Sequence, residues 1–348
     1  MIVDEDRGER DVAEALGNRL TRIVASPERL PDRASALLTT LRTVVPFEAA
    51  WLAFADPMSG AYVTAASVDL DQGTVDLLGG PAMARHIADT GADGDGPPRS
   101  RSAPSLPRAA ATASTNDAML GPAGFRGSLS VALYVPGRRH VGFLMLLSRS
   151  ASPASPTRRR RLAALAPLMA LGIDPMPSLL AMSRQVRGVT AGTVLRSDGL
   201  TQPLVGFDAH SLLTDDSPVL RIARHRLEDG IRRSSFLWPL SGAGGTFGHV
   251  QITVLAAPSD VPAALAGIVL VSPPSDLHDL TPRELEVLGL VVDGCSNNEI
   301  ADALTVAPRT VAAHLEHVLV KLAVRTRTLA AVRADREGIY VPVVPDDS

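Results

Sequence analysis

Two helix starts of the same kind stand fifteen residues apart near the end of this 348-residue chain. Thr281 and Glu284 have the spacing of a capping box, in which a hydroxyl and a carboxylate bond the first free amides of a helix. Ser296 and Glu299 repeat that spacing, and Gly294 lies between the two boxes, where a first helix must stop. The sequence therefore predicts two short helices joined by a tight turn.

A third helix is predicted from Pro308, because proline suits the first helical position. Its apolar residues recur at spacings of four, three and four, which is one face of an α-helix: Val311, Leu315, Val318 and Leu322. A fourth helix is predicted over residues 326–336, with Leu329, Ala330 and Val332 facing inward. Short helices with a tight turn between the second and third describe a helix-turn-helix, whose third helix enters a DNA major groove.

These residues resemble the LuxR/FixJ-type (GerE) helix-turn-helix family. The family pattern L-T-x-R-E-x-E-V-L-x-L appears from Leu280 to Leu290, and G-x-S-N-x-E-I-A follows from Gly294 to Ala301. T-V-x-x-H and K-L-x-V then appear at residues 310–314 and 321–324, so the match covers about a fifth of the chain. The resemblance implies a transcription regulator that binds double-stranded DNA in a sequence-specific manner.

The resemblance also implies which residues contact DNA. The predicted set is Asn297, Asn298, Thr305, Arg309, Thr310, Val311, Ala312, Ala313, His314, Glu316, His317, Lys321, Arg325 and Arg327. Two positions depart from the family pattern: Ala307 cannot cap the third helix as a serine would, and Ala312 stands where lysine is common. Ala312, Ala313 and Glu316 would face the groove, where alanine can contact thymine methyls and a carboxylate can accept from a cytosine amino group.

The charge of the predicted third and fourth helices favours binding in a DNA groove, but the charge of the whole chain does not. Between Thr305 and Val332 the chain carries four cations and one acid, a net charge of +3, although the whole protein has a net charge of −3. Neutralising phosphates with such cations supplies most non-specific DNA affinity. Lys321 and Arg309 are predicted to contact phosphates. The remaining alternative is a three-helix protein-interaction module whose charges are merely solvated.

Composition excludes several other classes of protein. Lys321 is the only lysine and is followed by leucine, so the Gly-Lys-Ser/Thr of an ATP-binding P-loop is absent. A phosphoacceptor receiver domain, which by its family pattern has its own lysine, is not expected either. Cys295 is the only cysteine, which fits a reducing cytoplasm, and no run of eighteen apolar residues predicts a membrane span. No metal site, cofactor or catalytic set is predicted.

The sequence predicts helices and strands over the first 275 residues. A helix is expected within residues 1–30, either for dimerisation or as the start of the next domain, and another over 32–44. Strands are expected over residues 49–55, 61–68, 128–135 and 140–148, a loop over 91–116, and a closing helix over 156–171 that begins in an Arg-rich run. This element order resembles a GAF domain over residues 31–173.

A second α/β domain is expected over residues 174–275, with Pro175 and Pro177 marking the boundary. Strands are predicted over residues 190–196, 202–206, 234–240, 246–256 and 267–272, and a helix over 218–230. The block resembles a PAS- or GAF-like sensor domain, and Pro273–Pro274 would be a stiff linker. The expected fold is multidomain, with two antiparallel-sheet α/β domains followed by an all-α four-helix helix-turn-helix domain over residues 276–348.

The sequence therefore predicts a cytoplasmic transcription regulator that is not an enzyme. It should bind a pseudo-palindromic operator as a homodimer, because one recognition helix covers too few base pairs for selectivity. A small-molecule ligand and RNA polymerase are candidate partners, and the N-terminal domains would sense a ligand or dimerise. The alternatives are a protein-interaction adaptor and an N-terminal enzyme tethered by the helix-turn-helix.

Overall fold

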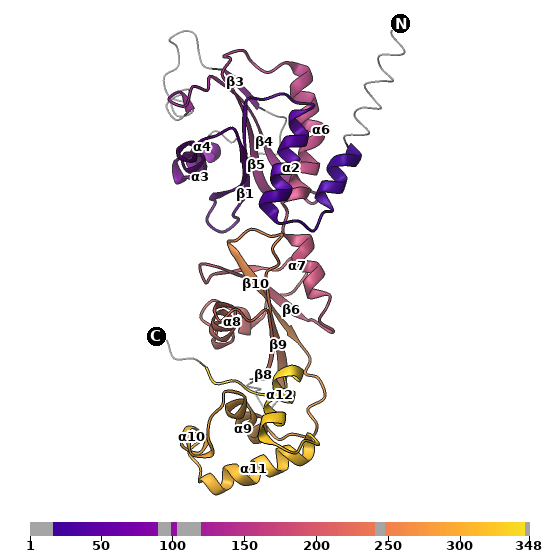
Figure 1. Ribbon diagram of the computed structural model, residues 1–348, viewed down its shortest axis with the longest axis vertical. Coiled ribbons are helices and arrows are strands. Elements are labelled where there is room, and N and C mark those ends of the chain that lie inside the picture. The colour runs from indigo at the N-terminus through magenta and orange to yellow at the C-terminus, as the bar shows by residue number, and fades with distance from the viewer. Residues whose placement is uncertain (1–16, 90–98, 103–119, 241–247, 345–348) are drawn as a thin grey trace. The chain divides into compact units, whose positions relative to one another are not determined.

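The computed structural model describes residues 17–89, 99–102, 120–240 and 248–344 (Figure 1). The chain forms two compact units. The first comprises Met1–Pro175 with Ser259–Pro262, and the second comprises Met176–Pro258 with Ala263–Ser348. The units therefore divide at Pro175, one of the two prolines that mark the predicted boundary.

The first unit contains a five-stranded antiparallel sheet in the order β2-β1-β5-β4-β3. Its strands are β1 (Ala49–Ala55), β2 (Tyr62–Val68), β3 (Arg99–Ser102), β4 (Gly127–Val135) and β5 (Arg139–Ser148). The four predicted strands are confirmed within a residue or so at each end. The prediction of a loop over residues 91–116 is wrong at β3, which pairs with β4, and the rest of that stretch lies outside the described residues.

Helices cover both faces of this sheet. On one face α2 (Leu30–Arg42) and α6 (Pro156–Ile173) pack against alternate residues of β1, among them Ala50 and Leu52. On the other face α3 (Gln72–Gly79) and α4 (Pro81–Asp89) pack over Trp51 and Ala53. Because both faces are covered, all seven residues of β1 are buried. The sequence did not predict α3 or α4.

Aromatic side chains fill the layer between the sheet and α3–α4. The rings of Trp51, Tyr62 and Phe143 lie 5.8 to 6.5 Å apart, centre to centre, at steep angles. The indole Nε1 of Trp51 donates a hydrogen bond of 2.9 Å to Thr64 Oγ1. The described side chains therefore pack against one another between the sheet and these helices.

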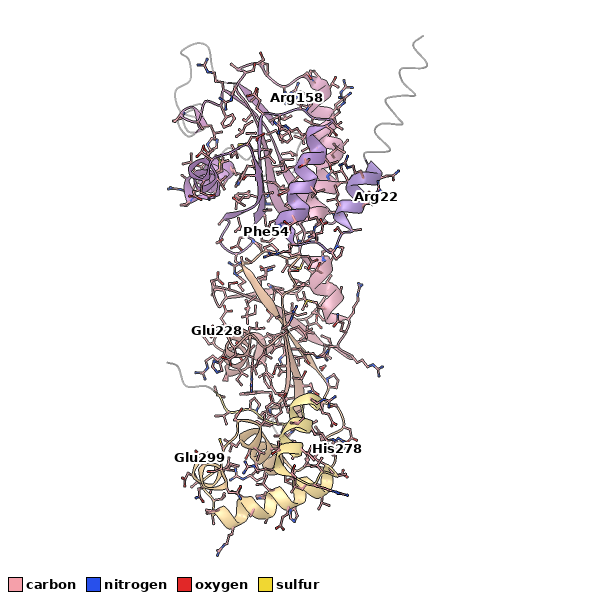
Figure 2. All side chains as sticks on the ribbon, viewed as in Figure 1. Arg22, Phe54, Arg158, Glu228, His278 and Glu299 are labelled. Carbon is pink, nitrogen blue, oxygen red and sulfur yellow. The ribbon has the colours of Figure 1, made fainter. Side chains whose placement is uncertain are left out.

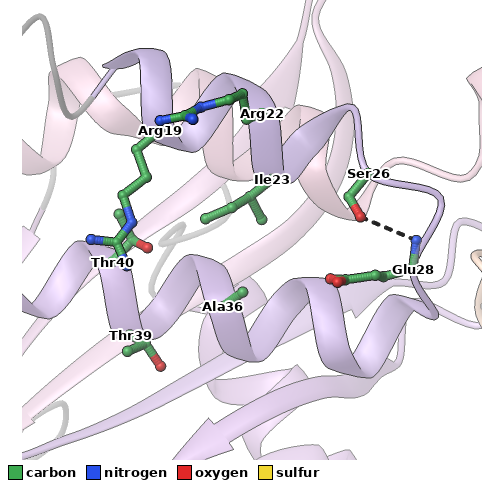
Figure 3. Close-up of a pocket in the computed structure, with 8 residues that line it drawn as sticks. All are labelled: Arg19, Arg22, Ile23, Ser26, Glu28, Ala36, Thr39 and Thr40. Carbon is green, nitrogen blue, oxygen red and sulfur yellow. Dashed lines mark hydrogen bonds between the residues drawn. The ribbon is translucent and has the colours of Figure 1, made fainter.

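Several arginines lie on the outer helices of the first unit. The helix predicted near the N-terminus is seen over residues 17–24, and with α2 it lines a surface groove of about 710 Å³ that includes Arg19, Arg22 and Thr39 (Figure 3). The Arg-rich run opens α6, as predicted (Figure 2). There Arg158 donates to Pro46 O and Arg161 donates to Val44 O, so two of the four arginines tie α6 to the loop after α2.

One stretch of the described residues, Pro156–Ser183, is long and apolar enough by composition to cross a membrane. It comprises α6 and α7 (Met176–Ser183), and half of its most apolar window is buried. Leu162, Met169 and Ile173 of α6 lie in the core beneath the first sheet. This burial is typical of a core helix in a globular domain.

The second unit contains another antiparallel sheet, in the order β7-β6-β10-β9-β8. Its strands are β6 (Ala191–Arg196), β7 (Thr201–Pro203), β8 (Arg233–Leu240), β9 (Gly248–Ala256) and β10 (Leu265–Ser272). A short 3₁₀ helix, η1 (Ser211–Leu213), and helix α8 (Pro218–Glu228) link β7 to β8. The predicted helix and four of the five predicted strands are confirmed. The strand predicted over residues 202–206 is shorter than expected, because β7 ends at Pro203 and residues 204–206 leave the sheet. η1 and α7 were not predicted.

Four helices complete the second unit: α9 (Pro282–Val292), α10 (Asn297–Ala303), α11 (Pro308–Lys321) and α12 (Arg327–Glu337). α9 is apolar on nearly every side, which is typical of a helix buried all round. Its Val287 and Leu290 meet α10 and α11, whereas Leu285 and Leu288 join a core that also contains Phe236 of β8. The helical domain thus shares a hydrophobic core with the second sheet. The expected architecture of two antiparallel α/β domains and a four-helix domain is confirmed.

Candidate nucleic-acid interface

Both predicted capping boxes are present. They fix the starts of α9 and α10, the two helices that support α11. Thr281 Oγ1 accepts from Glu284 N at 3.3 Å, and Glu284 Oε2 accepts from Thr281 N at 2.8 Å. Ser296 and Glu299 repeat this arrangement at the start of α10, with distances of 3.4 and 2.6 Å. Between the helices Gly294 has φ 86°, the left-handed turn that glycine favours. α11 begins without a side-chain cap, because Ala307 has no hydroxyl.

α11 presents two chemically different faces. Its predicted apolar stripe is buried, with Val311, Val318 and Leu322 fully so. Val311 was also assigned to the DNA contacts, and this assignment is corrected, because a side chain with no exposed surface can only support the helix. The opposite face is solvent-exposed and carries Arg309, Ala313, Glu316, His317 and Val320.

The other predicted contacts lie around this exposed face. Asn298, Thr305 and Arg325 are exposed, and Thr305 occupies a left-handed turn with φ 54° just before α11. The half-buried members of the set are Asn297, Thr310, Ala312, His314, Lys321 and Arg327. The structure thus gathers most of the predicted set around α11, although not every member is free to bind.

Lys321 binds inside the domain. Its Nζ lies 2.7 Å from Glu284 Oε2 and 2.8 Å from the carbonyl oxygen of Asp279. Glu284 is buried, and burial by itself raises the pKa of its carboxyl group, but the bonds from Lys321 and Thr281 outweigh burial and lower that pKa. Sequence reasoning missed this pair. Lys321 therefore holds the first helix to the third, and the structure gives no support to its predicted role at phosphates.

Arg327 is likewise engaged within the domain. Its guanidinium donates hydrogen bonds to the carbonyl oxygen of Cys295, at 2.5 Å, and to Asn297 Oδ1, at 3.5 Å, so it ties α12 to the turn between α9 and α10. Burial and the carboxylates of Asp293 and Glu299 raise the pKa of the Cys295 thiol. A neutral thiol is a poor nucleophile, so Cys295 is not a reactive group of this site.

Arg309 and Arg325 are the cations of the set that remain available. Both are exposed, and among the described residues neither has an acidic partner within 4.0 Å. The single carboxylate on the exposed face is Glu316. His317 Nδ1 lies 3.6 Å from Glu284 Oε1, and no group of three or more metal-ligating side chains is found among the residues described. The face is therefore weakly cationic and largely made of small or uncharged side chains.

The fourth helix differs from its prediction. Ala330 is buried as expected, but Leu329 and Val332 are 51% and 49% exposed. The second inward residue is Ala334, one turn after Ala330. Small inward residues let α12 pack closely on α9, which leaves the two larger residues on the outer surface.

Comparison with known families decides the identity of the helical domain. Residues 278–334 match the family described as bacterial regulatory proteins, luxR family. This segment is a LuxR-family domain. The match falls on α9 to α12, the part of the chain whose motifs carried the resemblance.

Curated relatives match a short part of this chain. The chain is 44% identical over 77 residues to the transcriptional regulatory protein LnrK of Bacillus subtilis, and the match covers 22% of this chain and 35% of LnrK. It is 38% identical over 65 residues to the nitrate/nitrite response regulator protein NarL of Escherichia coli, covering 19% and 30% of the two chains. The chain thus spans about a third or less of the length of the curated relatives it matches.

Solved structures similar to the chain include GAF domains. One, from a phosphoenolpyruvate-protein phosphotransferase of Coxiella burnetii, has a TM-score of 0.34 and 18% identity, covering 49% of this chain and 94% of its own. Another, the phycoerythrobilin-bound GAF domain of a cyanobacterial phytochrome, has a TM-score of 0.34 and 14% identity, covering 46% and 93%. Similarity at this level carries no argument on its own.

Proposed function

We propose that this chain is a cytoplasmic, DNA-binding transcription regulator that reads DNA through the exposed face of α11. The observation that supports this most is the combination of a LuxR-family match with an open helix face: the apolar stripe of α11 is buried, while Arg309, Ala313 and Glu316 remain in solvent. A helix with this exposure can enter a major groove without rearranging its own core.

We expect the active species to be a homodimer on a pseudo-palindromic operator. One recognition helix contacts only a few base pairs, and two helices related by a twofold axis double the site that is read. The α/β domains are proposed to sense a ligand or to dimerise, and RNA polymerase is the expected partner on DNA.

Footprinting of the full-length protein on promoter DNA tests the function. A protein that shows no salt-dependent protection of any fragment would be the adaptor or the tethered enzyme instead.

Arg309 is the cation best placed to meet a phosphate, because it is exposed in the first turn of α11 and has no acidic partner among the described residues. We expect Arg309→Ala to weaken binding about equally on all DNA sequences and to reduce the salt dependence of log K by about one phosphate's contribution. Anisotropy titrations over a series of salt concentrations measure this. Arg159→Ala, an exposed arginine on α6, makes the same charge change and should leave the slope unaltered.

Glu316 is proposed to read a base. Its carboxylate repels phosphates but can accept a hydrogen bond from cytosine N4. Glu316→Gln should raise general affinity modestly and relax one operator position by about 1–3 kcal/mol of discrimination. Binding-site selection with the wild type, Glu316→Gln and the exposed-site control Glu228→Gln shows the change as altered base preference. Three identical sequence preferences would make Glu316 a plain surface charge.

A further inference from the structure

The segment that follows α12, here named the C-terminal strap (residues 338–344), lies between α9 and the edge strand β8. The carbonyl oxygen of Tyr340 accepts a hydrogen bond of 2.8 Å from Leu237 N, and Val341 N donates to Leu285 O at 3.3 Å. Ile339 and Tyr340 are fully buried. α12 itself packs against β8 (Figure 1). The strap therefore joins the LuxR-family domain to the second sheet by backbone bonds as well as by apolar burial.

One side chain of β9 holds both ends of the helical domain. The Nε2 of Gln251 donates to the carbonyl oxygen of Gly338 at 3.0 Å, directly after α12. The Oε1 of Gln251 accepts from Ser275, from its amide at 3.3 Å and from its hydroxyl at 3.2 Å, in the segment that precedes α9. Gln251 is buried, and its amide is satisfied at both atoms. The chain is therefore fixed to the sheet at Ser275, directly after the predicted Pro273–Pro274 linker.

The contact at Gly338 has no room for a side chain. Gly338 has φ 68°, and a Cβ atom there would lie 2.3 Å from Gln251 Nε2 and 2.7 Å from Ser235 Cβ. Gly230 offers a matched comparison in the same unit, because it has φ 76° and no atom within 4 Å of its Cβ position. Alanine at either position suffers the same left-handed strain, but only alanine at 338 would force the strap away from the sheet.

The docked arrangement leaves the candidate interface open. Arg309, Ala313 and Glu316 are exposed while α12 and the strap are held on the sheet. Docking therefore does not cover the face that we propose to enter DNA. It fixes the direction in which that face points relative to the second α/β domain.

We propose that Gln251 and the C-terminal strap form a latch, and that the latched arrangement is the form that binds DNA. This inference rests on the proposed function. A domain attached only through residues 273–279 would sample many orientations, and ordering it on DNA would cost conformational entropy. A latched domain has already met that cost during folding, so the α/β domain can present α11 in one orientation.

The test compares full-length wild type, Gly338→Ala and Gly230→Ala by hydrogen exchange and by DNA titration. We expect Gly338→Ala to speed exchange of the Leu237 amide by tenfold or more, since that amide donates to the strap, and to weaken binding to a selected operator by about tenfold. Gly230→Ala should match the wild type in both measurements. Gln251→Glu provides a second variant, because a carboxylate facing the Gly338 carbonyl repels it, and it should move both measurements in the same direction even if Gly338→Ala folds poorly.

Three outcomes would overturn the latch. Equal Leu237 exchange in Gly338→Ala and Gly230→Ala would show that the strap is not what protects β8. Faster exchange with unchanged operator affinity would show that docking plays no part in binding, and faster exchange with higher affinity would make docking inhibitory. If the wild type binds no DNA, the proposed function fails together with the DNA-binding half of this proposal, whereas Leu237 exchange still decides whether the domain is latched.

Discussion

Gly289→Ala is expected to destabilise the second unit by about 3 kcal/mol or more, although alanine is the better helix former by about 1 kcal/mol. Gly289 lies in the middle of α9, and a Cβ there would sit 1.8 Å from the carbonyl oxygen of Val341 and 2.9 Å from its carbonyl carbon. These are backbone atoms, so no change of rotamer relieves the overlap. The strap must move, and Tyr340 moves with it. Burying a tyrosine removes roughly 150–250 Å² from water, worth about 4–6 kcal/mol at most.

Urea unfolding measures the effect, with Gly17→Ala as the control. Gly17 is also helical, but nothing lies within 4 Å of its Cβ position, so alanine there should be neutral or stabilising by up to about 1 kcal/mol. An unfolding midpoint for Gly289→Ala equal to that of the wild type would mean that the strap does not pass over α9.

Glu284→Ala is expected to lower the stability of the LuxR-family domain by about 2–3 kcal/mol. The substitution removes a capping box and leaves the Lys321 ammonium without its carboxylate 2.7 Å away. Breaking a buried pair typically costs about 3–5 kcal/mol. The loss expected here lies at or just below the lower end of that range, because Lys321 is 28% exposed and keeps its bond to Asp279 O.

Glu299→Ala is the matched variant for this measurement, because it breaks the second capping box, which has the same geometry and no buried ion pair. The difference in unfolding free energy between the two variants measures what the buried contacts of Glu284, chiefly its pair with Lys321, add to the cap. If both variants lose the same stability, the ion pair contributes nothing beyond the cap.

The carboxyl group of Glu284 makes the stability of the LuxR-family domain sensitive to acid. Folding lowers the pKa of Glu284 below its ordinary value of 4.5, so the folded state holds the ionised form more strongly than the unfolded state does. Its contribution to stability is therefore fully present above about pH 4.5 and is lost as pH falls through the folded pKa. Glu284→Gln should flatten the decline of stability in this acid range, as followed by denaturation at several pH values.

Local hydrogen bonding explains why the α9–α10 segment was predictable from sequence. Thr281 with Glu284, and Ser296 with Glu299, close their bonds within four residues, so the spacing alone specifies them. α3 and β3 are different. α3 has eight residues, and glycine at its second and last positions lowers its helix propensity, so it depends on packing against the sheet. β3 has four residues in a stretch rich in serine and arginine, and it is a strand because β4 pairs with it.

Long-range contacts explain what the sequence did not reveal about the candidate site. The bond between Lys321 and Glu284 joins residues 37 positions apart, and neither residue type signals a buried partner. The inward face of α12 was misjudged because Leu329 and Val332 are the larger apolar residues, whereas close packing on α9 selected Ala330 and Ala334. Only Gly338 could have indicated from the sequence where α12 ends and the strap begins, because glycine is common just past the end of a helix.

The hydrogen bond between Leu237 and Tyr340 joins residues that the ribosome synthesises at different times. Tyr340 is made about one hundred residues after Leu237, so the second sheet can form while its edge strand still lacks the strap. An uncovered edge strand offers free amides and carbonyls to any other extended chain, including another nascent copy. Until the strap is synthesised, β8 is therefore an edge strand open to wrong pairing, and folding of the LuxR-family domain against it removes that risk.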